Sequence, residues 1–123
     1  MVDEEPSLNQ LTHAIRKFVS DRNWQSFQKP NALAQSIAIE IGELLELFQW
    51  LSEGEIGELL SSDEYIEALS DEIADILIYT LRLADVSGID PSKSILNKMK
   101  KNEQKYPQKE WTGRIPDKIT KNE

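Results

Sequence analysis

The chain has 123 residues, enough for one domain with a hydrophobic core and too few to expect two. It contains no cysteine, which excludes disulfides, thiolate metal sites and thiol catalysis. Its net charge of −8 is unevenly distributed. Residues 40–75 hold twelve acidic residues and no Lys or Arg, whereas residues 93–121 hold nine basic and three acidic residues. This separation of charge argues against a nucleic-acid-binding protein.

The chain begins with Met-Val-Asp-Glu-Glu-Pro, which is acidic and is followed by no apolar segment. No apolar run approaches the roughly 18 residues that a membrane span needs. We therefore expect a cytoplasmic protein with no membrane partner.

The first half of the chain predicts two long helices. Ser7 and Gln10 form a capping-box pattern that opens a helix running to about Arg22. Residues 23–31 mix aromatic and polar side chains with a proline, which is typical of an ordered loop. A second helix is expected over residues 31–52.

The second half predicts two more long helices. A short helix is expected between Gly54 and Gly57, and a capping box of Ser61 and Glu64 opens a helix that stops near residue 88. The last helix, residues 91–105, begins with a proline in its first turn. No alternating stretch indicates a strand, so the fold is expected to be all-α.

Two of these helices carry acids at the same spacing, Glu40 with Glu43 and Glu72 with Asp75. Residues three apart project from neighbouring positions on a helix, and both pairs lie at the edge of an apolar stripe. If the helices pack together, four carboxylates converge where repulsion and desolvation penalise their charges. A solvated helix face is the alternative, but neither pair has a Lys or Arg four residues away. An all-oxygen ligand set favours Mg²⁺, or Mn²⁺, over zinc.

Lys98, Asn102 and Lys105 form a cationic and hydrogen-bonding stripe on the last helix. An ordinary surface is the alternative, but beside a metal site such a stripe suits phosphate groups. His13 is the only histidine and has no evident carboxylate partner, so histidine-based catalysis is not expected. Several aromatic residues can either contact a base or belong to the core; they include Trp24, Trp50 and Tyr79.

Three motifs in order resemble the MazG-like all-α nucleoside triphosphate pyrophosphohydrolases, with the dCTP pyrophosphatase branch most similar. They are Ile-Glu-Ile-Gly-Glu-Leu-Leu-Glu-Leu-Phe-Gln-Trp at 39–50, Asp-Glu-Ile-Ala-Asp-Ile-Leu-Ile-Tyr at 71–79, and the pattern Lys98-Met-x-x-Asn102-x-x-Lys-Tyr-Pro107. The resemblance implies an antiparallel bundle of four main helices, completed by oligomerisation into a homodimer or homotetramer. It implies a single domain over residues 1–123, with a core at about 7–107 and an irregular polar tail at 108–123.

The resemblance also implies cleavage of a nucleoside triphosphate, dCTP or a modified dCTP, to the monophosphate and pyrophosphate, a role in nucleotide-pool sanitation. The implied Mg²⁺ ligands are Glu40, Glu43, Glu72 and Asp75. The implied phosphate-binding residues are Lys98, Asn102 and Lys105, and the residues around the base are Trp24, Trp50 and Tyr79. Either Glu43 or Glu46 is expected to accept a proton from the attacking water.

Two departures from the family pattern bear on these expectations. Many members have paired glutamates where this chain has Ile39-Glu40, and the dCTP branch has a histidine where this chain has Gln28. The second departure leaves the base open, so a related enzyme acting on dUTP or another nucleotide is one alternative. A non-catalytic acidic helical interaction module is another.

Overall fold

The computed structural model describes residues 5–116, in which every regular element is a helix. The all-α prediction is therefore confirmed for this part of the chain. The chain forms two compact units that divide after Pro91. Among the described residues no helix is both long and apolar enough to cross a membrane.

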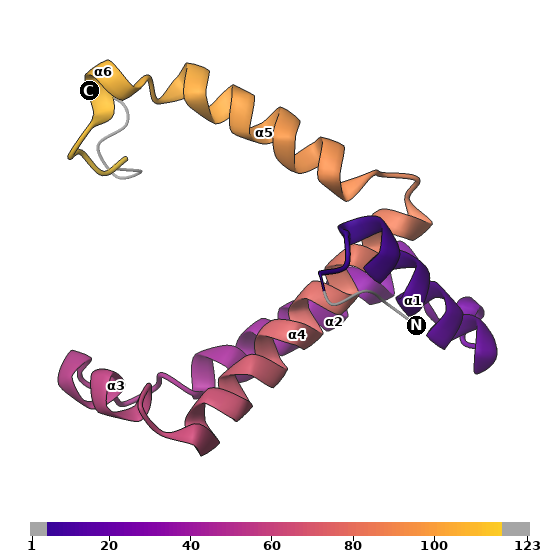
Figure 1. Cartoon of the computed structure of the whole chain (residues 1–123). Coiled ribbons are helices and arrows are strands. Elements are labelled where there is room, and N and C mark those ends of the chain that lie inside the picture. The colour runs from indigo at the N-terminus through magenta and orange to yellow at the C-terminus, as the bar shows by residue number, and fades with distance from the viewer. Residues whose placement is uncertain (1–4, 117–123) are drawn as a thin grey trace. The chain divides into compact units, whose positions relative to one another are not determined.

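The first unit contains α1 (Leu8–Asp21), the 3₁₀ turn η1 (Gln25–Phe27), α2 (Pro30–Glu46), α3 (Glu53–Leu59) and α4 (Asp63–Val86). The helices α2 and α4 pack along one another, and α1 packs on α4 (Figure 1). The pairing of α2 with α4 is antiparallel, because Tyr65 Oη donates to the Leu47 carbonyl near one end and Arg82 Nε donates to Gln28 Oε1 at the other.

Local sequence explains most of the helix ends. The predicted capping box at the start of α1 is confirmed, with the Ser7 hydroxyl accepting from the backbone N–H of Gln10 at 3.1 Å and the Gln10 side chain accepting from the Ser7 N–H at 2.8 Å. A second capping box joins Ser52 and Glu55 at the start of α3. The predicted stop after α4 is also confirmed, since Gly88 has φ +70°, which glycine adopts without a steric penalty.

Two expectations about element boundaries were wrong. The second helix ends at Glu46 and not near residue 52, because the chain turns over residues 47–50 and Trp50 takes φ +71°. The cap of α4 is Ser62 and not Ser61, since the Ser62 hydroxyl accepts from the backbone N–H of Tyr65 at 3.5 Å.

The second unit contains α5 (Pro91–Lys105) apart from its first residue, and α6 (Gln108–Trp111). The bounds of α5 are those predicted. The expectation of an irregular tail was wrong for residues 108–111, where one helical turn forms. The Tyr106 ring meets Trp111 edge to face with centroids 5.1 Å apart, and the Arg114 guanidinium lies 4.8 Å from the Trp111 centroid. These contacts fold the segment back on itself. The predicted tail beyond residue 116 lies outside the described residues.

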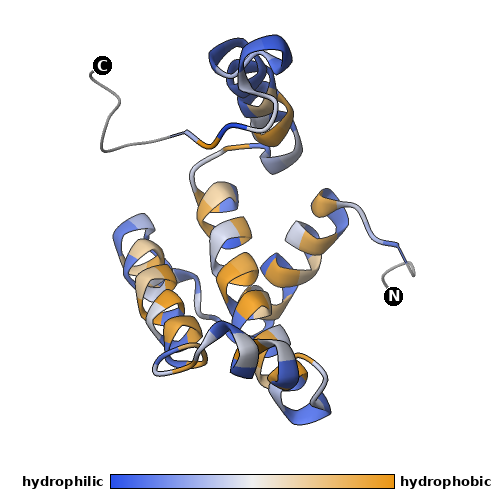
Figure 2. Cartoon of the chain, turned by 90° about the vertical axis from the view of Figure 1, so that its left-hand side faces the viewer, coloured by the Kyte–Doolittle hydropathy of each residue, from blue (hydrophilic) through white to orange (hydrophobic). Residues whose placement is uncertain are grey.

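The core of the first unit is small. Each of α1, α2 and α4 contributes one buried hydrophobic residue, namely Val19, Leu33 and Leu81. Many other apolar side chains on these helices stay at least two-fifths exposed. Figure 2 shows hydrophobic residues along much of the first unit, whereas the second unit is largely hydrophilic.

Candidate metal centre

The carboxylates of Glu40 and Glu43 on α2 meet that of Glu72 on α4. One oxygen from each of the three residues lies within 4.8 Å of the others. The antiparallel pairing of the two helices produces this cluster, because it sets Glu40 opposite Glu72, and Glu43 follows one turn later on α2. Three of the four predicted metal ligands are thus brought together.

Two oxygens of this acid cluster are buried and have no donor. Glu40 Oε2 and Glu72 Oε2 are both inaccessible to solvent, and neither has a hydrogen-bond partner among the described residues. Ionised carboxylates can only accept hydrogen bonds, so neither acid can satisfy the other while both are charged. A buried acceptor without a partner destabilises the folded chain, and more so when it is charged.

The proximity of these acids raises the pKa values of two of them. The pKa of Glu40 is raised to about 7, chiefly because the protonated group can donate to Glu72, with further contributions from burial and from Glu43 and Asp75. Burial and the charges of Glu43 and Asp75 also raise the pKa of Glu72. Without a bound cation the acid cluster therefore holds a proton near neutral pH.

Asp75, the fourth predicted ligand, lies outside the group of three converging oxygens. It is half-buried on α4, and its charge raises the pKa of both Glu40 and Glu72. Asp75 thus adds to the negative potential of the acid cluster.

The acid cluster fits a hard divalent cation. All its donors are carboxylate oxygens, which Mg²⁺, Mn²⁺ and Ca²⁺ prefer, and it has no nitrogen or sulfur donor that would select zinc. Glu40, Glu43 and Glu72 form no ion pair with a Lys or Arg in residues 5–116. A cation would supply the positive charge that the two buried oxygens lack.

The three aromatic candidates lie in different surroundings. Tyr79 is half-buried on α4, one turn beyond Asp75. Trp24 follows α1 and packs edge to face against the Phe18 ring, with the ring centroids 5.9 Å apart. Trp50 lies in the turn after α2 and is 90% exposed, so it takes no part in the core of the described chain.

The candidate phosphate-binding residues Lys98, Asn102 and Lys105 are exposed on α5, in the second unit. Their spacing of four and three residues keeps them on one side of that helix. Lys105 Nζ also lies 5.3 Å from the centroid of the Tyr106 ring.

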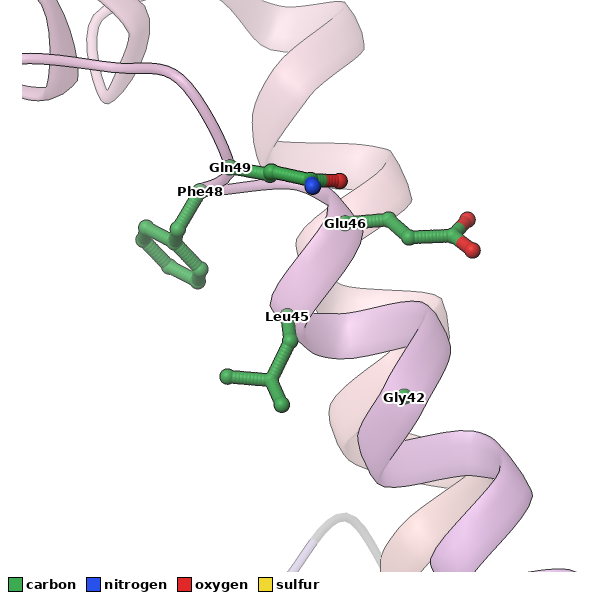
Figure 3. A pocket seen from close by; sticks show the side chains of 5 residues that line it. All are labelled: Gly42, Leu45, Glu46, Phe48 and Gln49. Carbon is green, nitrogen blue, oxygen red and sulfur yellow. The ribbon is translucent and has the colours of Figure 1, made fainter.

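Glu46, one candidate proton acceptor, borders a shallow hollow of about 440 Å³ at the end of α2. The hollow is also lined by Gly42, Leu45, Phe48 and Gln49. Figure 3 shows the Glu46 carboxylate pointing away from Leu45 and Phe48. Glu46 lies one turn beyond Glu43 and outside the three-oxygen group.

The sequence did not lead us to a buried polar network at the other end of α4. Arg82 is only 7% exposed and donates to Gln28 Oε1 at 2.7 Å and to Asp85 Oδ2 at 2.9 Å. Arg16 on α1 donates to the same carboxylate, from Nη2 to Oδ1 at 2.6 Å and from Nε to Oδ2 at 2.9 Å. These hydrogen bonds lower the pKa of Asp85. The available signal was an Arg and an Asp three residues apart within the apolar end of α4.

The helical architecture and the carboxylate cluster agree with the family comparison. The MazG-like family model matches residues 35–114, which includes both acid pairs and α5. The chain belongs to the MazG-like family.

Individual relatives carry more specific names. The chain is 36% identical over 103 residues to dCTP pyrophosphatase 1 of Rattus norvegicus and 37% identical over 103 residues to that of Homo sapiens. Each match covers 84% of this chain but only 61% of the relative. A solved pyrophosphatase structure from Archaeoglobus fulgidus DSM 4304 is similar with a TM-score of 0.75 and 41% identity, over 87% of this chain and 98% of that one.

Proposed function

We propose that this chain is a metal-dependent nucleotide pyrophosphohydrolase that converts dCTP, or a modified dCTP, to the monophosphate and pyrophosphate. The buried Glu40 and Glu72 oxygens without donors are the observation that carries the proposal, because they create a demand for a cation. The names of the pyrophosphatase relatives support the reaction and the cytosine base.

The proposed metal is Mg²⁺, with Mn²⁺ as a substitute, held by Glu40, Glu43 and Glu72 with Asp75 close by. Bound there, the cation supplies positive charge against the phosphate oxygens. The carboxylates have a second effect, since their own charge repels a triphosphate that arrives without metal.

In the proposed reaction, water attacks the α-phosphorus. A bond forms from the water oxygen to phosphorus, the bond from the α-phosphorus to the bridging oxygen breaks, and pyrophosphate leaves with that oxygen. Glu43 or Glu46 accepts the proton from water. Glu43 belongs to the three-oxygen group while Glu46 stands outside it, so Glu46→Gln tests the role of proton acceptor separately from metal binding.

The remaining substrate contacts follow from the chemistry of the side chains. We propose that Lys98, Asn102 and Lys105 bind phosphate oxygens through their N–H groups. We propose that Trp24, Trp50 and Tyr79 lie around the base, where aromatic faces stack.

We further propose that the chain acts as a homodimer or homotetramer. The support is an apolar groove of about 390 Å³ between α1 and α4, to which Phe18, Leu77 and Ile78 contribute side chains that are 42–55% exposed. Apolar surface of this kind is stabilised when it is covered. Light scattering on the eluting protein tests the stoichiometry, and a monomer at micromolar concentration contradicts it.

The activity is tested with a panel of canonical and modified nucleoside triphosphates in H₂¹⁸O, with Mg²⁺ or Mn²⁺ present. Cleavage at the α-phosphorus places the label in the monophosphate, whereas attack at the β-phosphorus places it in pyrophosphate. Release of a diphosphate and orthophosphate contradicts the proposed reaction, and preference for dUTP corrects the base.

A non-catalytic acidic module is the contrasting outcome. It predicts no hydrolysis of any nucleotide and no change in thermal midpoint with Mg²⁺ and dCTP. A ligand that binds the folded state raises the midpoint by mass action. A flat response together with no turnover therefore overturns the proposed function.

A further inference from the structure

The turn that ends α2 is held by a side chain from α4. In a longer α2, the Leu47 carbonyl would accept from the Leu51 N–H one turn later. The Leu51 N–H instead donates to the Phe48 carbonyl at 3.3 Å, and Tyr65 Oη donates to the Leu47 carbonyl at 2.8 Å. Tyr65 thus occupies the acceptor that a longer helix would use.

The Tyr65 ring also packs against this turn. It meets the Phe48 ring edge to face, with the ring centroids 6.2 Å apart and the ring planes at 87°. Both rings are half-buried, and Figure 3 shows the Phe48 ring on the same side of the chain as Leu45. Residues 47 and 48 are therefore fixed to the first turn of α4 by a hydrogen bond and by a ring contact.

The same turn holds Trp50 in a conformation that a tryptophan rarely adopts. Its φ of +71° lies in the left-handed region, which sterically disfavours a large side chain. The side chain is 90% exposed, so burial of the indole does not offset this strain. Backbone strain persists only where neighbouring contacts impose it, and it is concentrated at functional sites. The contacts of Tyr65 with residues 47 and 48 are in a position to impose it here.

The turn also changes where Trp50 lies relative to the acid cluster. Trp50 is seven residues beyond Glu43, so a continuous helix would place it two turns further along the same side, about 10 Å along the axis. Because α2 ends at Glu46, residues 47–50 leave that line. The hydrogen bond from Tyr65 therefore favours one placement of the indole over another.

We propose that Tyr65 is a positioning residue for substrate binding, which holds the Trp50 indole in place for the nucleotide through the Leu47 carbonyl. In this proposal Tyr65 touches neither the substrate nor the metal. The proposal rests on the proposed function and deepens it, because it adds a residue of α4 to those that set the affinity for the nucleotide.

The test removes one hydroxyl group. Tyr65→Phe keeps the ring and its contact with Phe48, so the fold should be retained. Thr12→Val is the matched control, since the Thr12 hydroxyl also donates to a backbone carbonyl at 2.8 Å within the first unit, but on α1. Each substitution is made in the wild-type chain, and Tyr65→Phe is also made in the Trp50→Ala chain. Steady-state kinetics are then measured with the preferred nucleotide.

For Tyr65→Phe we expect KM to rise about three- to tenfold while kcat stays within about twofold of the wild-type value, because the lost hydrogen bond acts on binding. Trp50→Ala alone should raise KM about tenfold or more. Adding Tyr65→Phe to Trp50→Ala should change KM no further, because Tyr65 acts through the indole. Thr12→Val should lower the thermal midpoint and leave KM unchanged.

Phe48→Leu gives a second measurement. It loosens the same turn and leaves the Tyr65 hydroxyl in place, so it should also raise KM at unchanged kcat. Thermal unfolding of each variant checks the fold, and Phe48→Leu decides the matter if Tyr65→Phe unfolds. Hydrogen exchange of residues 47–51 should be faster in both variants than in the wild-type chain.

The outcomes separate the two proposals. Wild-type KM in both Tyr65→Phe and Phe48→Leu overturns this inference and leaves the proposed function standing. The same rise in KM in the Trp50→Ala chain also overturns it, because Tyr65 would then act by another route. A raised KM with unchanged hydrogen exchange at residues 47–51 contradicts the role of the Leu47 carbonyl. If the wild-type chain neither hydrolyses nor binds any nucleotide, both proposals fail.

Discussion

Metal binding by the acid cluster should depend steeply on pH, because the cation has to displace a proton. The pKa of Glu40 is about 7, and that of Glu72 is also raised. Each pH unit below 7 then lowers the apparent Mg²⁺ affinity about tenfold for every proton displaced, and the affinity levels off about one unit above 7.

The same shift fixes the sign of the stability change without metal. Between the ordinary carboxyl pKa of about 4.3 and the folded value of about 7, the folded chain binds more protons than the unfolded chain. This contribution to the free energy of unfolding is therefore present at low pH and is lost as the pH rises through that window. Mg²⁺ should restore it at neutral and higher pH.

Calorimetric titration with Mg²⁺ and Mn²⁺ between pH 5.5 and 8.5 measures the affinity, and buffers of different ionisation enthalpy count the protons released. Glu67→Gln is the matched control, since it removes one exposed charge from α4 outside the cluster. Glu72→Gln should weaken binding and flatten its pH dependence, because Glu72 is the main cause of the raised Glu40 pKa. Affinity that stays constant from pH 5.5 to 8.5 in the wild-type chain would refute this account of the cluster.

Three further predictions concern catalysis and the packing of the first unit. At saturating Mg²⁺, Glu43→Gln should lower kcat about a hundredfold or more, and Asp75→Asn should lower it about ten- to hundredfold. Both variants should keep the circular dichroism of the wild-type chain. Wild-type turnover in Glu43→Gln would contradict the metal role. Leu33→Ala should reduce the free energy of unfolding by about 2–5 kcal/mol in chemical denaturation, because Leu33 is 2% exposed, whereas Leu45→Ala at a 62% exposed position should cost well under half of that. Arg16 lowers the pKa of Asp85, so the wild-type chain should exceed Asp85→Asn in free energy of unfolding by a constant amount above about pH 5. This difference should shrink as acid protonates Asp85. A difference that is independent of pH down to about 2.5 would count against the ion pair.

Helix starts and stops could be predicted where the signal is local. Ser7 with Gln10, Gly88 and Pro91 all act within one turn of their own position, and the structure places helix ends at each of them. The early end of α2 has a different origin, because residues 44–51 contain neither Gly nor Pro. There the Leu47 carbonyl accepts from Tyr65 Oη at 2.8 Å, a partner eighteen residues away. A contact of that kind cannot be read from the helical pattern of α2 alone.

The Arg82 network was missed for a similar reason. Asp85 lies three residues beyond Arg82 on the same helix, but Gln28 lies in the segment between α1 and α2, which no helical spacing connects to Arg82. The conformation of that segment also depends on Asn23 at φ +55°, a region that asparagine tolerates better than most residues. Such sites become visible only once the helices are paired.

The register of α2 against α4 also explains why three of the predicted acids converge and the fourth does not. Glu40 and Glu72 lie at the same level of the antiparallel pair. Glu43 and Asp75 each lie three residues further along their own helices, and therefore in opposite directions from that level. Glu43 and Asp75 are therefore separated by about 9 Å along the pair. The spacing in the sequence predicted that four carboxylates converge, but the opposite chain directions set Glu43 and Asp75 on opposite sides of the level of Glu40 and Glu72. The demand for a cation is strongest at the level of Glu40 and Glu72, where their buried oxygens lack donors.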